Sequence, residues 1–285
     1  MTRSMRTYFY AVLGGIGGLI AWQISNLLGL SFGPNLYASE ALVGGLVGAC
    51  VGLFIGLTEG AMTLNVVQAA KSGLLSGLLG ILAGAIGLPL SEYLFQKVGA
   101  GYFGRALGWA IFGMLIGLAQ GIFGKSQIWK GMLGGFVGGA IGGLLLEAVR
   151  GYLQNPLAGK AAGLVLLGAS VGALISLVEV ALGRAWLEVT SGKLKGTEFI
   201  LDKFMHAKGP SILIGSSALK SEIVLPDPDI APQHAMLTGD GRQFTVKDMS
   251  LSGTFINNRK IQQARLGNGQ RIRMGNTELV YHEKR

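Results

Sequence analysis

Residues 248–257 read Asp248-Met249-Ser250-Leu251-Ser252-Gly253-Thr254-Phe255-Ile256-Asn257. Small polar residues are followed by β-branched and aromatic ones, a pattern that predicts two short strands meeting at a tight Ser/Gly/Thr loop. His234 precedes this stretch, and Gly269-Gln270-Arg271-Ile272-Arg273-Met274-Gly275 follows it. Working outward, we interpret everything before residue 185 as the part that holds this loop at a membrane.

The chain divides into two parts of different composition. Of its 285 residues, 50% are hydrophobic and 48 are glycine. Residues 1–184 contain no Asp and five Glu, whereas residues 185–285 hold the other ten acidic residues. About half of the formal charge of +9 falls in the apolar part, where basic loops set membrane topology, so the charge does not indicate a nucleic-acid partner. The single Cys50 excludes a disulfide framework.

Six apolar runs predict transmembrane helices because each is close to the roughly 20 residues that cross a bilayer. The first run follows Arg3 and Arg6 but lacks a small-residue cleavage site, so we expect it to remain attached. The runs cover residues 8–30, 41–61, 73–95, 105–124, 131–149 and 161–183.

Basic residues in the loops predict the orientation. With a cytoplasmic N-terminus, the inside loops hold more Lys and Arg than the outside loops. An even number of helices then places residues 185–285 in the cytoplasm. The prediction is a multi-pass protein of the plasma or inner membrane. The inside group is Arg3, Arg6, Lys71, Lys125, Lys130, Arg184, Lys193 and Lys195, and the outside group is Lys97, Arg105, Arg150 and Lys160.

The apolar part contains an internal repeat with a period near 60 residues. The motif at 54–60 (FIGLTEG) recurs at 115–121 (LIGLAQG) and, in weaker form, at 174–180 (LISLVEV). A helical hairpin used three times is the simplest explanation.

Glycine spacing predicts how the helices pack. Glycines four residues apart form a groove without side chains, which lets helices approach backbone to backbone in lipid. This favours a tightly packed bundle or a homo-oligomer seam. The two longest series are Gly44, Gly48, Gly52, Gly56 and Gly60, and Gly131, Gly135, Gly139 and Gly143.

The positions of the acidic residues in the apolar part indicate whether this part could transport an ion. Glu59, Glu92, Glu147 and Glu179 lie near helix ends rather than at mid-bilayer, where ionisable residues are usually functional. A shared ion relay is not indicated, because Gln120 stands where the first and third repeats have Glu59 and Glu179.

The polar part predicts an all-β sandwich that begins directly after the last helix. About ten short β-rich runs separated by turn residues occur in about 100 residues, and no flexible linker precedes them. The runs are 185–189, 197–201, 211–214, 222–225, 234–238, 243–247, 254–257, 261–262, 271–273 and 277–282.

Residues 185–283 resemble the forkhead-associated (FHA) family. The matching motifs, in order, are Ile214-Gly215, Glu222-Ile223-Val224-Leu225, Gln233-His234-Ala235, the stretch 248–257, and Leu266-x-Asn268-Gly269-Gln270-x-Ile272-x-Met274-Gly275. The resemblance implies an eleven-stranded sandwich whose loops at one end bind phosphothreonine peptides. It assigns structural roles to His234 and Gly215. It places partner contacts at Ser216, Ser250, Ser252, Gly253, Thr254 and Asn257, and we add Lys220 because the longer loop that carries it can bring its ammonium group to the same site.

The phosphate-binding positions of that family are altered in this chain. Ser216 stands where the family has the Arg that grips phosphate, and Ala231-Pro232 replaces the Ser-Arg pair of the following loop. Each charge-assisted bond lost in this way is worth about 1.5–3 kcal/mol. Arg259 and Lys260 are expected at the opposite end, because they follow the turn after the strand that begins at Thr254.

These observations predict a membrane-anchored FHA-type adaptor that docks a partner protein, with phosphothreonine dependence weakened or lost. The alternatives are a small transporter, channel or export component with an FHA-like regulatory domain, or a purely structural membrane oligomer. No catalytic residues, metal site or cofactor are predicted. The G-x-G-x-x-G at 99–104 lies between two apolar runs rather than after a strand, so it is not interpreted as a dinucleotide site.

Overall fold

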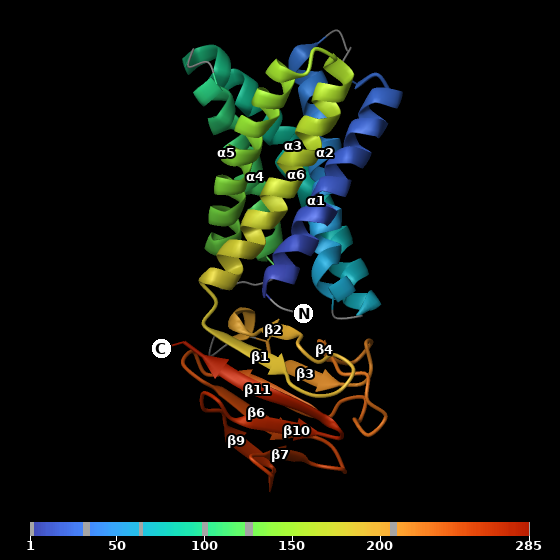
Figure 1. Cartoon of the computed structure of the whole chain (residues 1–285), viewed down its shortest axis with the longest axis vertical. Coiled ribbons are helices and arrows are strands. Elements are labelled where there is room, and N and C mark those ends of the chain that lie inside the picture. The colour runs from blue at the N-terminus through green and yellow to red at the C-terminus, as the bar shows by residue number, and fades with distance from the viewer. Residues whose placement is uncertain are drawn as a thin grey trace.

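A computed structural model describes residues 3–30, 35–62, 65–98, 102–122, 128–205 and 210–284. Within these ranges the chain forms six α-helices followed by eleven β-strands. The helices stand together as a bundle, and the strands form a sandwich against one end of it (Figure 1). The predicted order of a helical part followed by an all-β part is confirmed.

Each helix begins before its predicted apolar run, because residues that precede the run continue the helical turns, whereas α1, α4 and α6 end before their runs do. Among the described residues, five helices are long and apolar enough to cross a membrane, while the apolar part of the fourth is the shorter segment Ala106–Ile122. The helices are α1 (Arg3–Leu27), α2 (Leu36–Met62), α3 (Val66–Val98), α4 (Tyr102–Ile122), α5 (Ile128–Tyr152) and α6 (Pro156–Ala181).

The six helices form a closed ring, in which each packs on the next and α1 packs on α6. The even-numbered helices supply much of the interior. Ile55, Ile116 and Ile175 belong to one buried cluster and are each 0% exposed. These residues hold the same position in the sequence motif at 54–60, 115–121 and 174–180, so equivalent side chains meet inside the ring.

The closest contacts between helices occur at glycines. A Cβ on Gly48 would overlap the carbonyl of Gly80, and one on Gly135 would overlap that of Gly113. All nine glycines of the two predicted series face a neighbouring helix of the same chain, α3 for the α2 series and α4 for the α5 series. The grooves therefore lie inside one bundle rather than on its outer surface.

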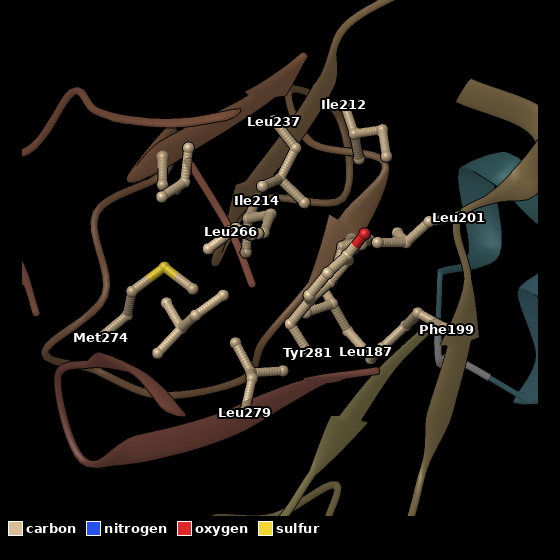
Figure 2. Close-up of a cluster of buried hydrophobic side chains, with 14 of the residues drawn as sticks. Leu187, Phe199, Leu201, Ile212, Ile214, Leu237, Leu266, Met274, Leu279 and Tyr281 are labelled. Carbon is tan, nitrogen blue, oxygen red and sulfur yellow. The ribbon is translucent and has the colours of Figure 1, made fainter. Parts of the chain in front are cut away.

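The strands form two sheets, with orders β2-β1-β11-β10-β7-β8 and β4-β3-β5-β6-β9. Figure 2 shows Leu187 and Met274 of the first sheet and Leu237 of the second in the shared interior. The strands are β1 (Ala185–Val189), β2 (Glu198–Ile200), β3 (Ile212–Gly215), β4 (Ile223–Val224), β5 (Ala235–Gly239), β6 (Phe244–Asp248), β7 (Thr254–Ile256), β8 (Arg259–Ile261), β9 (Gln263–Arg265), β10 (Arg271–Met274) and β11 (Thr277–Glu283).

The sequence predicted a single strand at 261–262, where the structure has two. β8 pairs with β7 in the first sheet, whereas β9 pairs with β6 in the second. The chain crosses between the sheets at Gln262, which leaves each strand only three residues long. Such short, exposed segments carry little hydrophobic pattern by which they can be predicted.

The sandwich is joined to the bundle by buried polar contacts. The Lys130 Nζ of α5 lies 2.7 Å from the Asp202 Oδ2, and the two side chains are 4% and 3% exposed. Asp202 also accepts the backbone N–H groups of Arg184 and Ala185, which connect α6 to β1. Lys130, which the topology prediction counts among the inside-loop cations, lies within α5, and this ion pair neutralises its charge.

A second contact joins the other side of the sandwich to the bundle. Asn65, at the start of α3, donates from Nδ2 to the carbonyl of Ser221, at 3.3 Å. Asn65 also caps α3 by accepting the Gln68 N–H at Oδ1. With contacts at both α3 and α5, the sandwich is seated on the bundle at two points.

Candidate peptide-binding site

Three loops of the sandwich meet at one end: residues 216–222, 225–234 and 249–253, which we call the loop end. Backbone hydrogen bonds connect them, from Ser216 N–H to the Ala231 carbonyl (3.0 Å) and from Met249 N–H to the His234 carbonyl (2.9 Å). A Cβ on Gly215 would overlap the carbonyl of Pro232, so glycine permits this close approach. The loops that the FHA resemblance assigns to peptide binding thus lie side by side.

His234 is the buried centre of the loop end, at 0% exposed. Its Nδ1 accepts the Ala231 N–H at 3.2 Å, which leaves Nε2 as the protonated nitrogen. Nε2 lies 3.3 Å from the Gly253 carbonyl and 3.2 Å from the Ser250 Oγ. His234 thus holds two loops together, and this geometry is that of a structural residue.

Asp248 organises the Ser/Gly/Thr loop and was not singled out from sequence. Its Oδ1 accepts the Ser250 hydroxyl at 2.9 Å and the Thr254 hydroxyl at 2.8 Å. Thr254 is 0% exposed. The two hydroxyls that the resemblance assigns to a partner therefore point inward. The only signal in the sequence was an acidic residue two and six positions before hydroxyl side chains.

The environment of Asp248 shifts its pKa downward. Burial alone would raise the pKa of this carboxyl, but the hydrogen bonds from Thr254 and Ser250 stabilise the charged form and outweigh burial. A carboxyl with a depressed folded-state pKa contributes stability above its unfolded pKa of about 3.9 and loses it as pH falls through the folded pKa.

We therefore expect Asp248→Asn to destabilise the sandwich by about 1–3 kcal/mol at neutral pH, because an amide cannot accept both hydroxyls as a carboxylate does. Urea unfolding measured from pH 7 down to pH 3 would show this difference shrinking below about pH 4. A wild-type–variant difference that stays constant over this range would contradict the assignment.

The altered side of the loop end faces the bundle. The Ser216 Oγ donates to the Ile230 carbonyl at 2.8 Å, so its hydroxyl is used to close the loop. Ser221 of the same loop receives the contact from Asn65. Lys220 is exposed, and its carbonyl accepts from Gln233 Nε2. The loop that would carry the phosphate-gripping Arg instead touches the bundle.

The expectation that Lys260 lies at the opposite end is wrong. β8 runs back antiparallel to β7, which places Lys260 opposite Phe255. A Cβ built on Gly253 would lie 2.8 Å from the Lys260 Nζ, so this ammonium group sits on the Ser/Gly/Thr loop. The prediction considered only the distance from Thr254 to the turn, whereas β8 reverses direction after the turn and returns toward the loop.

Asn257 is not brought to the loop end. It adopts a positive φ of 48° in the β7–β8 turn, and its Oδ1 accepts the Arg271 N–H at 3.1 Å. The three-residue strand β7 lies between it and Gly253, which places the two residues about 13 Å apart. Of the predicted partner contacts, Ser252 and Lys220 are exposed, and Ser216 and Ser250 are half-buried.

Exposed apolar side chains also mark the loop end. Leu251 is fully exposed, Leu219 is 81% exposed and Met249 is 48% exposed. Large apolar side chains on protein-binding loops commonly contact partner proteins. Sequence reasoning missed them, although an apolar residue within a polar turn was the available signal.

Among the described residues, no three His, Cys, Asp or Glu side chains are grouped so that they could hold a metal ion. The loop end offers the ammonium groups of Lys220 and Lys260, backbone amides and apolar side chains. This chemistry suits the binding of an extended protein segment.

Comparison with known proteins supports the FHA resemblance of the sandwich. The family model for the FHA domain matches residues 212–275. The glycogen accumulation regulator GarA of Mycolicibacterium smegmatis is 32% identical over 111 residues, which are 39% of this chain and 66% of GarA. An oxoglutarate dehydrogenase inhibitor of Corynebacterium jeikeium is 33% identical over 100 residues, 35% of this chain and 65% of that protein. The chain thus spans about two thirds or less of these curated relatives.

Solved structures similar to this chain include the FHA domain of CT664 from Chlamydia trachomatis (28% identity, TM-score 0.33), which covers 36% of this chain and 99% of that one. Another is the FhaA FHA domain complexed with the intracellular domain of Rv3910 (26% identity, TM-score 0.30), covering 34% and 99%. The family-model match lies wholly within the C-terminal sandwich. The C-terminal sandwich, matched over residues 212–275, is therefore a member of the FHA domain family.

Proposed function

We propose that the chain is a membrane-anchored FHA-type adaptor that docks a partner protein at the cytoplasmic face, with phosphothreonine dependence weakened or lost. The proposal rests on three features: an apolar bundle, a sandwich fixed to its end, and an altered peptide-binding end.

The outer surface of α3 carries the membrane part of the proposal. Leu74, Leu78, Leu82 and Ile86 follow one another at four-residue spacing and are each about 60% exposed. Residues four apart lie on one face of a helix, so they form a continuous apolar stripe. Such a stripe is unfavourable in water and is normally covered, and lipid is the cover that suits a long apolar helix.

In Figure 1, the FHA domain lies on the same side of the bundle as the start of α1, which the basic residues predict to be cytoplasmic. α1 begins, and α6 ends, at the bundle end that faces the sandwich (Figure 1). Arg6 and Glu179 pair there at 2.6 Å, which joins those two helices. The FHA domain then lies directly at the membrane face, and its loop end reaches only partners that come to this surface.

The loop end supports protein docking more than phosphate reading. Lys260 supplies one flexible ammonium group in place of a planar Arg that can form two parallel bonds. Leu251 and Met249 add exposed apolar area beside it. We therefore assign the binding energy mainly to apolar and backbone contacts, with Lys260 favouring an acidic or phosphorylated segment.

Capture by inverted membrane vesicles carrying the full chain would test this function. We expect the vesicles to retain partners from lysate. Phosphatase treatment of that lysate should lower retention by less than about tenfold. A tenfold change is about 1.4 kcal/mol, which is no more than one charge-assisted bond. Leu251→Ser and Lys260→Gln should each weaken retention, whereas the matched control Arg259→Gln, on the same strand but nearer the turn, should not.

Several results would reject the proposal. If Arg259→Gln weakened partner retention as much as Lys260→Gln, the attraction would be a non-specific charge effect. Complete loss after phosphatase treatment would instead restore the FHA domain as a phosphothreonine reader. Retention by right-side-out vesicles alone would reject the cytoplasmic position. The transporter interpretation gains no support from the ring interior, where Ile55, Ile116 and Ile175 are fully buried.

A further inference from the structure

A cavity of about 230 Å³ lies between the helices at the bundle end farthest from the sandwich. Five helices line it, from α2 through α6. Its volume is slightly below the roughly 300–1,000 Å³ of drug-sized ligand sites, which favours a metabolite-sized ligand. In the proposed orientation, this end of the bundle faces away from the cytoplasm.

Three helices build the cavity in the same way. α2 contributes Val43 and Glu40, and α6 contributes Leu164 and Lys160. On α5 the corresponding pair is Leu146 and Arg150. In each pair the charged residue lies about one helical turn, roughly 5 Å, farther from the sandwich than the apolar one. The cavity therefore has an apolar floor below a ring of charges.

The floor is closed. Val43, Leu146 and Leu164 are each at most 9% exposed, and Trp109 adds a large aromatic surface. Deeper in the ring, Ile55 and Ile116 are fully buried. A molecule that enters from this end therefore stops at the floor, as it does in a binding site.

The rim brings two cations and one carboxylate to the cavity. Lys160 lies within electrostatic range of both Arg150 and Glu40. Arg150 also pairs at 3.6 Å with Glu147, which lines an adjoining cavity of about 450 Å³. Arg150 and Lys160 suit one anionic group between them, and Glu40 suits an ammonium group.

We propose that this cavity binds a small zwitterion with an apolar group. Its carboxylate or phosphate would lie between Arg150 and Lys160, its ammonium group on Glu40, and its apolar part against Val43, Leu164 and Trp109. Two sources carry this chemistry: a free aliphatic amino acid, and an ethanolamine phospholipid, whose acyl chains supply the apolar part. The bundle would then act as a receptor in addition to an anchor.

Calorimetric titration of the full chain in nanodiscs of phosphatidylglycerol would test the site. L-leucine is the probe for the free source, and dihexanoylphosphatidylethanolamine, which keeps short acyl chains, is the probe for the lipid source. We expect one of them to bind saturably. For leucine, both leucinamide, which lacks the carboxylate, and 4-methylpentanoate, which lacks the ammonium group, should bind at least tenfold more weakly.

Variants separate the parts of the site. Lys160→Gln should weaken the binding of the probe at least tenfold, and Glu40→Gln should remove the preference for the ammonium group. Leu164→Trp should fill the floor and abolish binding. Lys97→Gln, an exposed cation at the same end of the bundle, is the matched control and should bind as wild type. Unchanged thermal unfolding would show that each variant is folded.

The outcomes are decisive for both sources. Binding of leucine assigns a soluble ligand, and binding of dihexanoylphosphatidylethanolamine assigns the lipid. The proposal is overturned if neither probe binds, or if binding is indifferent to Glu40→Gln and Lys160→Gln. Partner capture at the loop end uses other residues, so its failure would leave this result unaffected.

Discussion

Replacing Lys130 with methionine is expected to destabilise the full-length protein by about 3–5 kcal/mol, because Asp202 would remain buried without its counter-charge. The Asp202 side chain is 3% exposed, and Lys130 also donates to the Leu182 carbonyl at 2.6 Å. The variant removes both the ion pair and a partner for the end of α6. The joint between bundle and FHA domain should therefore loosen before either part unfolds.

A double-mutant cycle would measure this joint. Lys130→Met, Asp202→Asn and the combined variant would be compared by chemical unfolding in detergent. We expect the combined variant to be less destabilised than the sum of the two single variants, because a neutral amide in place of the Asp202 carboxylate no longer needs the cation. Lys71→Met is the control, since Lys71 is an exposed lysine near the start of α3, and it should change stability by less than about 0.5 kcal/mol. A coupling near zero would show that the pair does not hold the joint.

The same substitution, glycine to alanine, is expected to have opposite effects at two positions of the bundle. Gly151→Ala should stabilise by up to about 1 kcal/mol, because this helical glycine has open space around it and alanine is the better helix former. Gly84→Ala should destabilise by about 3 kcal/mol or more. Its new Cβ would overlap the carbonyl of Gly44, and a backbone group cannot move aside as a side chain can.

Thermal unfolding and size-exclusion chromatography of the two variants would check this contrast. Because both substitutions replace a helical glycine with alanine, the difference between them reports mainly the contact between α2 and α3. Similar stability of Gly84→Ala and Gly151→Ala would show that the two helices separate at little cost. In that case, glycine spacing would not explain how the bundle packs.

Local patterns in the sequence were sufficient for the order of helices and strands. Long apolar runs require helices, and short β-branched runs between turn residues require strands, because each pattern reflects neighbours within a few residues. The loop at 250–253 and the structural position of His234 were also accessible in this way. The altered Ser216 and Ala231 were visible as departures from the family motif.

Contacts between distant residues were not accessible. Lys130 and Asp202 are far apart in the chain, and nothing in either local sequence indicates the other. Lys260 was misplaced because a strand was followed to its turn but not back along the next strand. The Thr254 hydroxyl points inward because Asp248 accepts its hydrogen bond. Glu40, Arg150 and Lys160 come together only because the ends of three helices lie side by side in the bundle.

In the Ser/Gly/Thr stretch at 248–257, backbone geometry and side-chain direction have different origins. By itself the sequence determined that these residues form a tight loop at the binding end of an FHA domain, because Gly253 and its flanking residues specify backbone geometry locally. Only the tertiary structure decided which side chains face a partner. Packing turned Ser250 and Thr254 toward Asp248, and strand pairing brought Lys260 onto the loop. Side-chain direction depends on neighbours that folding, rather than sequence proximity, brings together.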